Sequence, residues 1–227
     1  MQRFSREEAR EEKLQKQEKP LLSYLRNSHF MAISIASALD AFASSPFFLF
    51  LPFLLLHKGV NPVFLGPFTA IYLLGNFTGK TLLGRVSDML GSTKTFIFSE
   101  IANVIFIFLL LLPLHQFVII IISFLLGTLT KGTSPVIATL ITESMNLDDN
   151  YQQAFAVNTF ILNIATIISP FILGILSNTY SLNVAFYVMA LTTFLAIFPV
   201  IGYATIKERK LSTKVVTEIK EEEIISQ

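Results

Sequence analysis

Four ionisable side chains lie inside stretches of this sequence that are otherwise almost entirely apolar: Asp40, Lys80, Glu100 and Lys131. A charged side chain at the centre of a bilayer costs at least about 2.5 kcal/mol unless it is paired or hydrated. These four residues are therefore the first candidates for binding a solute or carrying a proton. Asp40 and Lys131 fall near the middle of their apolar stretches, whereas Lys80 and Glu100 fall closer to one end.

Asp40 and Lys131 each belong to a stripe of small or polar residues at helical spacing, and such stripes face a protein interior or a water-filled cavity. One stripe contains Ser34, Ser37, Asp40 and Ser44, and the other contains Ser123, Gly127, Lys131, Ser134 and Thr142. We expect Asp40 to bind a cation or a proton, and Lys131 to bind an anionic group or to tune the protonation of Asp40. Ser37, Ser44 and Ser134 complete this predicted site. The alternative is a structural Asp40–Lys131 pair that only holds two helices together.

Lys80 and Glu100 lie on either side of a predicted turn at Gly91. They are about eleven and nine residues from it, so their depths differ by only about 3 Å at 1.5 Å per residue. We therefore predict that Lys80 and Glu100 form a structural ion pair near the membrane surface. The alternative for Lys80 is that its long side chain reaches the surface alone.

The elements that position these charges must be membrane-spanning helices. The chain has 227 residues, of which 52% are hydrophobic and 15% charged, and 22 are Phe. Soluble proteins carry about a quarter charged residues. The chain has no Cys, which excludes disulfides and thiolate metal sites. We predict neither a metal site nor a cofactor, and no nucleic-acid partner.

Six apolar stretches are long enough to cross a bilayer as helices. They cover residues 29–56, 62–87, 94–113, 116–141, 152–177 and 181–205, with turn-forming residues between them. We predict an all-α integral membrane protein with a six-helix transmembrane domain at 29–206. Residues 1–28 are predicted to be a polar linker or surface helix, and residues 207–227 a charged tail. The continuous apolar runs lack the alternation of strands.

The basic residues predict the orientation of these spans. An even number of spans places both termini on one side, and that side holds 14 of the 17 Lys and Arg residues. The opposite side holds Lys58. Because cytoplasmic loops carry an excess of Lys and Arg, both termini are predicted to be cytoplasmic in a multi-pass protein of the cell membrane.

The stretch GRVSDMLGSTK, residues 84–94, forms the short cytoplasmic loop between the second and third predicted spans. Gly84 would let two helices approach closely. The Asp88 carboxylate precedes the third helix, where backbone N–H groups at a helix N-terminus can bind it. Gly91 permits the tight reversal, and Arg85 and Lys94 hold the loop on the cytoplasmic side.

This loop resembles the G-x-[LV]-[AS]-D-[RK]-x-G-[RK]-[RK] signature of the major facilitator superfamily. The matching residues are Gly84, Val86, Ser87, Asp88 and Gly91. Met89, Ser92 and Thr93 depart from it, and Lys94 partly compensates. In that family the loop follows the second helix of each six-helix half and acts as a cytoplasmic gate latch. Its Asp faces helix ends of the other half.

Longer segments extend the resemblance over nearly the whole chain, as a C-terminal half. Residues 125–145 resemble the tenth helix of such transporters, residues 168–198 resemble the eleventh and twelfth, and residues 1–28 resemble the central linker. The resemblance implies alternating-access transport of a small solute at the midplane between two halves. Asp40 is the candidate for proton coupling. The expected partners are the lipid bilayer, the solute, and a second six-helix half, either another copy or a separate chain.

Two alternatives remain at the level of the sequence. The chain could be a truncated, non-transporting membrane protein that keeps only the packing of a transporter half. A six-span channel is less well supported, because no filter or gating element stands out. An enzyme is not expected. GNFTGKT at 75–81 has one residue too few for a phosphate-binding loop, and no G-x-S-x-G element with a partner His is present.

Overall fold

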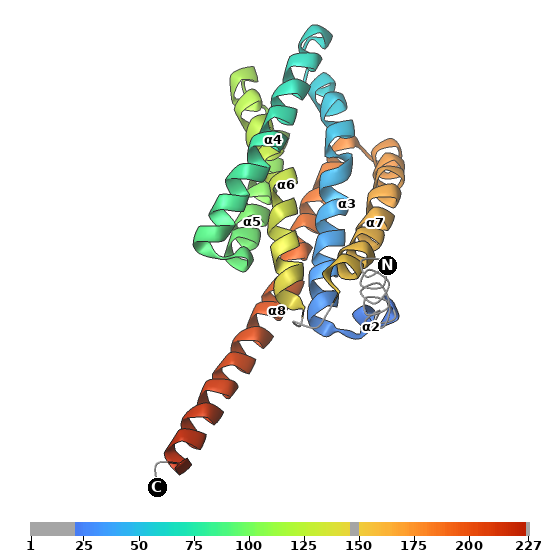
Figure 1. The fold of residues 1–227 in the computed structure, drawn as a ribbon. Helices are drawn as coiled ribbons and strands as arrows, with labels where there is room; N and C mark the ends of the chain where they lie inside the picture. Colours follow the sequence, from blue (N-terminus) through green and yellow to red (C-terminus); the bar gives the residue numbers. More distant parts are fainter. Residues whose placement is uncertain (1–20, 146–149, 226–227) are drawn as a thin grey trace, which may run out of the picture.

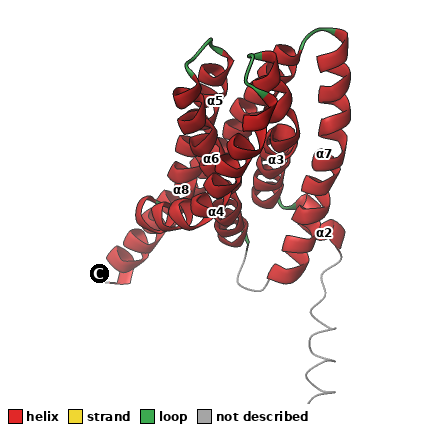
Figure 2. Ribbon diagram, turned by 90° about the horizontal axis from the view of Figure 1, so that it is seen from above, coloured by secondary structure: helices red, strands yellow, loops and turns green. Residues whose placement is uncertain are grey.

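The computed structural model describes residues 21–145 and 150–225 (Figures 1 and 2). Their regular elements are α2 (Leu21–Arg26), α3 (Ser28–His57), a short 3₁₀ turn η1 (Pro62–Phe64), α4 (Leu65–Leu90), α5 (Ser92–Leu111), α6 (Gln116–Ser144), α7 (Tyr151–Thr179) and α8 (Leu182–Ile225). Residues 1–20 of the predicted polar segment 1–28 and residues 146–149 of the acidic loop after α6 lie outside the described residues.

The prediction of an all-helical membrane protein is confirmed over the described ranges. Helices α3, α5, α6, α7 and α8 as far as Arg209 are long and apolar enough to cross a membrane. Helix α4 has 26 residues but does not qualify by hydropathy, since it carries Asn76, Lys80, Arg85 and Asp88. Helix α8 passes the predicted end of the last span at 205 and continues as one helix to Ile225.

Local chemistry sets where the helices begin and end. The Asn27 side chain accepts hydrogen bonds from the N–H groups of His29 and Phe30 at the start of α3. Asn150 accepts bonds from the N–H groups of Gln152 and Gln153 at the start of α7. Gly91 separates α4 from α5 with φ 87°, a left-handed conformation that favours glycine. The predicted reversal at Gly91 is therefore present.

The long helices run alternately up and down, from α3 to α8 (Figure 1). Helix α3 packs against α7 and α8, α4 packs along α6, and α5 packs against α6 and α8. Figure 2 shows α7 at the edge of the bundle. The turn between α4 and α5 lies at the same end of the bundle as α2, whereas η1 and the turn before α6 lie at the other end (Figure 1).

Glycines bring α4 and α6 into backbone contact. A Cβ atom on Gly75 would overlap the Phe124 carbonyl of α6, and one on Gly79 would overlap the backbone of Thr128. A Cβ on Gly84 would meet only Pro135, at 4.0 Å. The close approach of helices therefore occurs at Gly75 and Gly79, and the expectation for Gly84 is wrong.

The buried interior consists of two apolar clusters. One surrounds Phe47, Tyr72 and Phe186, and the other surrounds Phe30, Phe96 and Tyr203. Buried polar residues occupy the level between them along the helices. This polar layer comprises Asp40 on α3, Glu100 and Asn103 on α5 and Thr193 on α8, together with Thr133 on α6, whose hydroxyl bonds to Asp40.

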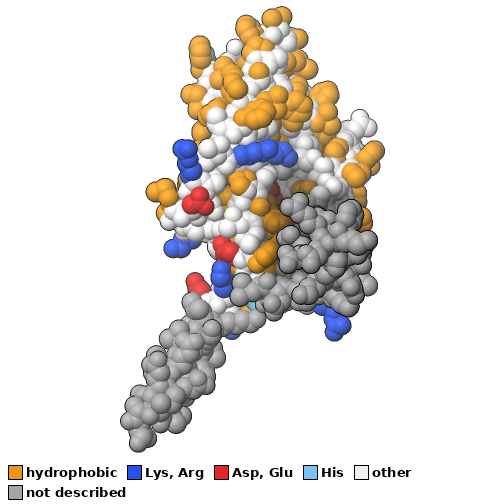
Figure 3. Space-filling model, viewed as in Figure 1, with side chains coloured by type: hydrophobic (Ala, Val, Ile, Leu, Met, Phe, Trp, Pro, Cys, Tyr) orange, Lys and Arg blue, Asp and Glu red, His pale blue; other side chains and the backbone are white. Residues whose placement is uncertain are grey.

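The surface of the bundle, unlike its interior, is divided into an apolar half and a charged half. Hydrophobic side chains cover the end of the bundle that carries η1, and charged side chains gather over the half that carries the α4–α5 turn (Figure 3). An apolar exterior is unfavourable in water and favourable in the hydrocarbon of a bilayer. The exterior is therefore that of a membrane-embedded bundle with one charged end.

Candidate functional site

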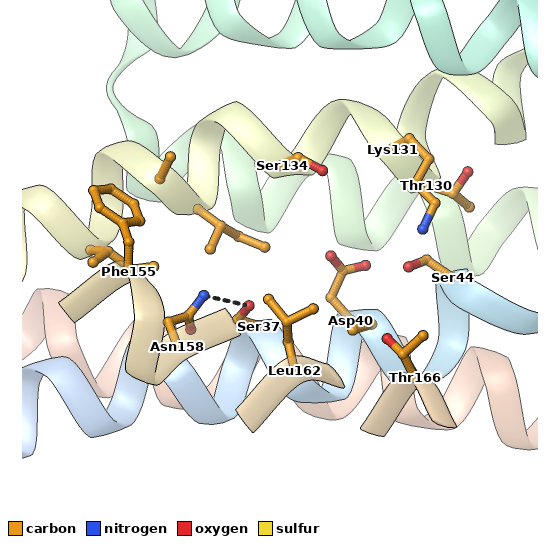
Figure 4. A pocket seen from close by; sticks show the side chains of 14 residues that line it. Ser37, Asp40, Ser44, Thr130, Lys131, Ser134, Phe155, Asn158, Leu162 and Thr166 are labelled. Atoms are coloured by element: carbon orange, nitrogen blue, oxygen red, sulfur yellow. Dashed lines mark hydrogen bonds between the residues drawn. The ribbon is translucent and has the colours of Figure 1, made fainter. Parts of the chain in front are cut away.

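A cavity of about 190 Å³ lies between α3, α6 and α7, next to the polar layer (Figure 4). Its apolar walls include Ile137, Phe155 and Leu162. The polar residues that line it are Ser37, Asp40, Ser44, Thr130, Lys131, Ser134, Asn158 and Thr166. A cavity with a few polar groups among apolar walls is typical of a small-molecule site.

The structure brings together all five residues that the sequence predicts for binding. Ser37, Asp40 and Ser44 project from α3, and Lys131 and Ser134 from α6, into this one cavity (Figure 4). The helical spacing of the stripes accounts for the residues of each helix that share the cavity, whereas Gly127 of the second stripe packs against α4. What these residues bind stays a prediction.

Asp40 is 5% exposed and makes one hydrogen bond. Its Oδ2 accepts from the Thr133 hydroxyl at 2.9 Å, and its buried Oδ1 has no hydrogen-bond partner among the described residues. Lys131 extends from α6 toward Asp40 and Ser44 (Figure 4). Within the described ranges no salt bridge joins Asp40 and Lys131. Both groups line the cavity, and their roles, binding or structural, stay predictions.

Sequence reasoning missed Thr133 and Thr130, which support the cavity from α6. Thr133 fixes the Asp40 carboxylate, and the Thr130 hydroxyl lies 2.9 Å from the Tyr72 hydroxyl of α4. The signal was their three-residue spacing in an apolar helix, beside the stripe that contains Lys131. Asn158 of α7 donates to Ser37 Oγ at 3.5 Å, which links the third wall of the cavity to α3.

The predicted ion pair between Lys80 and Glu100 is not formed. Glu100 is fully buried, and neither of its carboxylate oxygens has a hydrogen-bond partner in the described part of the chain. Lys80 is exposed on α4. Lys80 and Glu100 have similar depths along the bundle. However, Gly79 of α4 faces α6. Because successive residues of an α-helix are rotated by about 100°, the neighbouring Lys80 points away from the bundle.

The residues of the predicted gate loop lie at the α4–α5 turn. Arg85, Asp88, Gly91 and Lys94 are exposed. Asp88 belongs to the last turn of α4, and no side chain caps the N-terminus of α5. The expectation that Asp88 binds this helix end is therefore wrong for the described residues, because the carboxylate points outward from α4 before the chain reverses.

Glu143, at the end of α6, contacts the start of α5 in place of Asp88. Its Oε1 accepts from the Ser92 hydroxyl at 2.9 Å, and its Oε2 lies 2.6 Å from Lys207 Nζ of α8. The Ser87 hydroxyl of α4 donates to Ser92 Oγ at 3.2 Å. These contacts join the end of α4, the start of α5, the end of α6 and an interior position of α8. Sequence reasoning missed this contact because it joins residues far apart in the chain.

These features define a class of protein: a multi-pass helical membrane protein with a polar cavity among its spans. The comparisons with known proteins assign the family. Residues 33–225, most of the chain, match the model of the Major Facilitator Superfamily. The chain belongs to the major facilitator superfamily, which is a family of membrane transporters and not of enzymes.

A solved structure of a transporter shares the fold. The chain is similar to "In meso crystal structure of the POT family transporter PepTSo", with a TM-score of 0.67 and 16% identity. The match covers 77% of this chain and 37% of that one, so the chain spans less than half the length of that transporter. No curated protein matches the sequence.

Proposed function

We propose that the protein takes part in secondary active transport of a small solute by alternating access, with the cavity between α3, α6 and α7 as its binding site. The observation that carries this proposal is the convergence of Asp40 and Lys131 on one cavity without an ion pair between them. Charged groups in a membrane interior pair with one another or face water or a ligand. Family membership supports transport as the general activity.

The two charged groups have different proposed roles. Asp40 binds a cationic group or the coupling proton, because its buried Oδ1 is free to accept a hydrogen bond. Lys131 binds an anionic group of the solute, since an ammonium is a donor of three hydrogen bonds. Ser37, Ser44 and Ser134 offer hydroxyl groups along the same walls. The cavity volume of about 190 Å³ suits a small solute.

The proposed topology has six spans with both termini in the cytoplasm. Helix α4 is the sixth span in this proposal, because its 26 residues extend about 39 Å at 1.5 Å per residue, which exceeds the hydrocarbon thickness of about 30 Å. Arg85 and Lys94 flank the α4–α5 turn, which lies in the charged half of the bundle, and this end is cytoplasmic by the positive-inside rule.

A second six-helix half is proposed to face the cavity. The similar transporter is more than twice as long as the segment matched here, which is consistent with two halves around one site. The second half is another copy of the chain or a separate chain. In this arrangement the exposed Asp88 binds helix ends of that half, as the gate loop of the family does.

Reconstitution tests the function. The purified chain is sized by light scattering with the detergent contribution subtracted, and the fraction with twice the mass of the chain is placed in liposomes. A panel of radiolabelled solutes bearing an amino group, a carboxylate or both, with a neutral sugar as reference, is tested under an imposed pH gradient. We expect gradient-driven accumulation of a charged class.

Asp40→Asn should abolish that accumulation but spare exchange of the same solute, because the residue holds the coupling proton. Lys58→Gln, which changes a charge outside the cavity, is the matched control and should behave as the unmodified chain. Gradient-driven uptake by Asp40→Asn at the unmodified rate would rule out this role for Asp40. A failure of every solute with a properly sized preparation would count against transport by two copies of the chain.

A further inference from the structure

Glu100 is a fully buried carboxyl group of the described chain that the cavity does not use. Its exposed fraction is 0%, and both carboxylate oxygens lack a hydrogen-bond partner among the described residues. A carboxylate without a partner in an apolar interior is strongly unfavourable, and such a group takes up a proton instead. The neutral acid needs far less solvation, so it fits this position.

The polar layer that contains Glu100 holds further buried oxygen atoms without a hydrogen-bond partner among the described residues. Asn103, one turn along α5, has an unpartnered buried Oδ1, and Thr193 on α8 has an unpartnered buried Oγ1. These atoms belong to the polar layer between the two apolar clusters. A protonated carboxyl has an O–H group to donate at this level, whereas an ionised one can only accept.

Glu100 lies behind the cavity and not in it. The cavity is lined by residues of α3, α6 and α7, whereas Glu100 is on α5, which packs against α4, α6 and α8. Asp40 lines the cavity from α3 and lies in the same polar layer as Glu100. The polar layer therefore contains one carboxyl group at the cavity and a second one shielded from it.

No basic side chain of the packed helices compensates Glu100 within the described ranges. On α4, Lys80, Arg85 and Asp88 are exposed. On α6, Lys131 faces the cavity, and Glu143 is bonded to Lys207 of α8 at the charged end of the bundle. The other acidic group of the polar layer, Asp40 on α3, cannot balance a negative charge on Glu100.

We propose that Glu100 is a proton-binding site behind the solute cavity and that it carries its proton at neutral pH. The ligand is a proton, bound to a carboxylate oxygen as a neutral carboxylic acid. This site is separate from the coupling role proposed for Asp40. The site does not depend on the transported solute, so it can be tested independently of the proposed function.

Infrared spectroscopy of the full chain in lipid nanodiscs at neutral pH tests the site. We expect a carbonyl-stretch band of a protonated carboxyl that is lost in Glu100→Gln and kept in Glu143→Gln. Glu143 is the matched control because it is ion-paired with Lys207 and partly exposed. Since glutamine is a neutral isostere, Glu100→Gln should also unfold at an unchanged or higher temperature than the unmodified chain.

A second measurement needs no variant and therefore covers the case in which Glu100→Gln does not fold. Carbon-13 labelling of glutamate alone should shift the protonated-carboxyl band, whereas labelling of aspartate alone should not. Absence of a protonated glutamate band at neutral pH would overturn the proposal. Its appearance only after sodium is removed would also overturn it, because the group would then be an ionised ligand of a sodium ion.

Discussion

At the residue scale, the contact between Thr133 and Asp40 determines how the carboxylate is presented to the cavity. Thr133 is buried on α6 and donates to Oδ2, which leaves Oδ1 as the atom available to a proton or a ligand. Hydrogen bonds to charged groups contribute more to stability than neutral ones, and an unsatisfied buried partner is costly. Thr133 therefore holds Asp40 in its orientation and supports the fold around it.

The substitution Thr133→Val tests this contact. It removes the hydroxyl at nearly constant volume and should lower the free energy of unfolding by about 1–3 kcal/mol, because Asp40 loses its hydrogen bond. Thr133→Ser keeps the donor and should lose less. Thermal unfolding of both variants in the same detergent measures the difference. Equal or greater stability of Thr133→Val relative to Thr133→Ser would show that the bond contributes nothing.

The sequence predicts which residues line the cavity where this depends only on the spacing of residues along one helix. Asp40 and Lys131 were placed in a cavity because the spacing of small and polar residues around them identifies a face of each helix. The predicted ion pair between Lys80 and Glu100 was wrong because it rested on their similar depth in the membrane. Depth does not say in which direction around the helix a side chain points. The direction in which each helix faces is set by neighbours far away in the sequence, here by the packing of Gly75 and Gly79 on α6.

At the scale of elements, α4 and α6 approach closely enough for their backbones to be in contact. Gly75 and Gly79 of α4 lie against Phe124 and Thr128 of α6, where a Cβ has no space. Small residues allow membrane helices to approach closely, and packing of this kind drives their association. The same contact gives α4 a protein neighbour along its length despite its lower hydropathy.

Two glycine substitutions on one helix separate this contact from a general effect of glycine. Gly79→Ala should destabilise the protein by about 1–3 kcal/mol, because the new methyl group overlaps the Thr128 backbone and the helices must separate. Gly84→Ala has space and should instead stabilise α4 by about 0.5–1 kcal/mol. Thermal unfolding in detergent compares them, and equal effects of the two substitutions would contradict the proposed contact.

Helix positions are the part of the fold that the sequence predicts best. The predicted starts and ends of the first five spans lie within four residues of helices α3 to α7, since the length of an apolar run and its flanking turns are local properties. The end of α8 was missed because a change from apolar to charged residues marks where a membrane ends, and a helix can continue past it. The sequence could not predict the contacts of Glu143 with Ser92 and Lys207, because these residues are far apart in the chain and meet only in the folded bundle. The same reason applies to the contact between Thr133 and Asp40.

At the scale of the whole molecule, the orientation in the membrane can be tested at two exposed side chains. Val63 in η1 is 77% exposed and lies at one end of the bundle, whereas Met89 near the α4–α5 turn is 82% exposed and lies at the other. The chain has no Cys, so each substitution introduces a single reactive thiol.

In intact cells, a membrane-impermeant maleimide should label Val63→Cys, because η1 is proposed to face outward. Met89→Cys should be labelled only after the membrane is permeabilised, since the α4–α5 turn is proposed to be cytoplasmic. The similar exposure of the two positions makes each a control for the reactivity of the other. Labelling of Met89→Cys alone in intact cells would reverse the orientation.

The glycine contact between α4 and α6 also has a mechanical consequence for the cavity. Because the backbones of α4 and α6 are in contact, we expect the two helices to move together. The cavity wall that carries Lys131 is then stiff. A smaller share of α7 is buried in the bundle, 11% of its span against 56% for α6. We therefore expect one stiff side and one compliant side of the cavity. Its volume should change most easily by displacement of α7, which carries Asn158 and Phe155, while Lys131 on α6 stays in place.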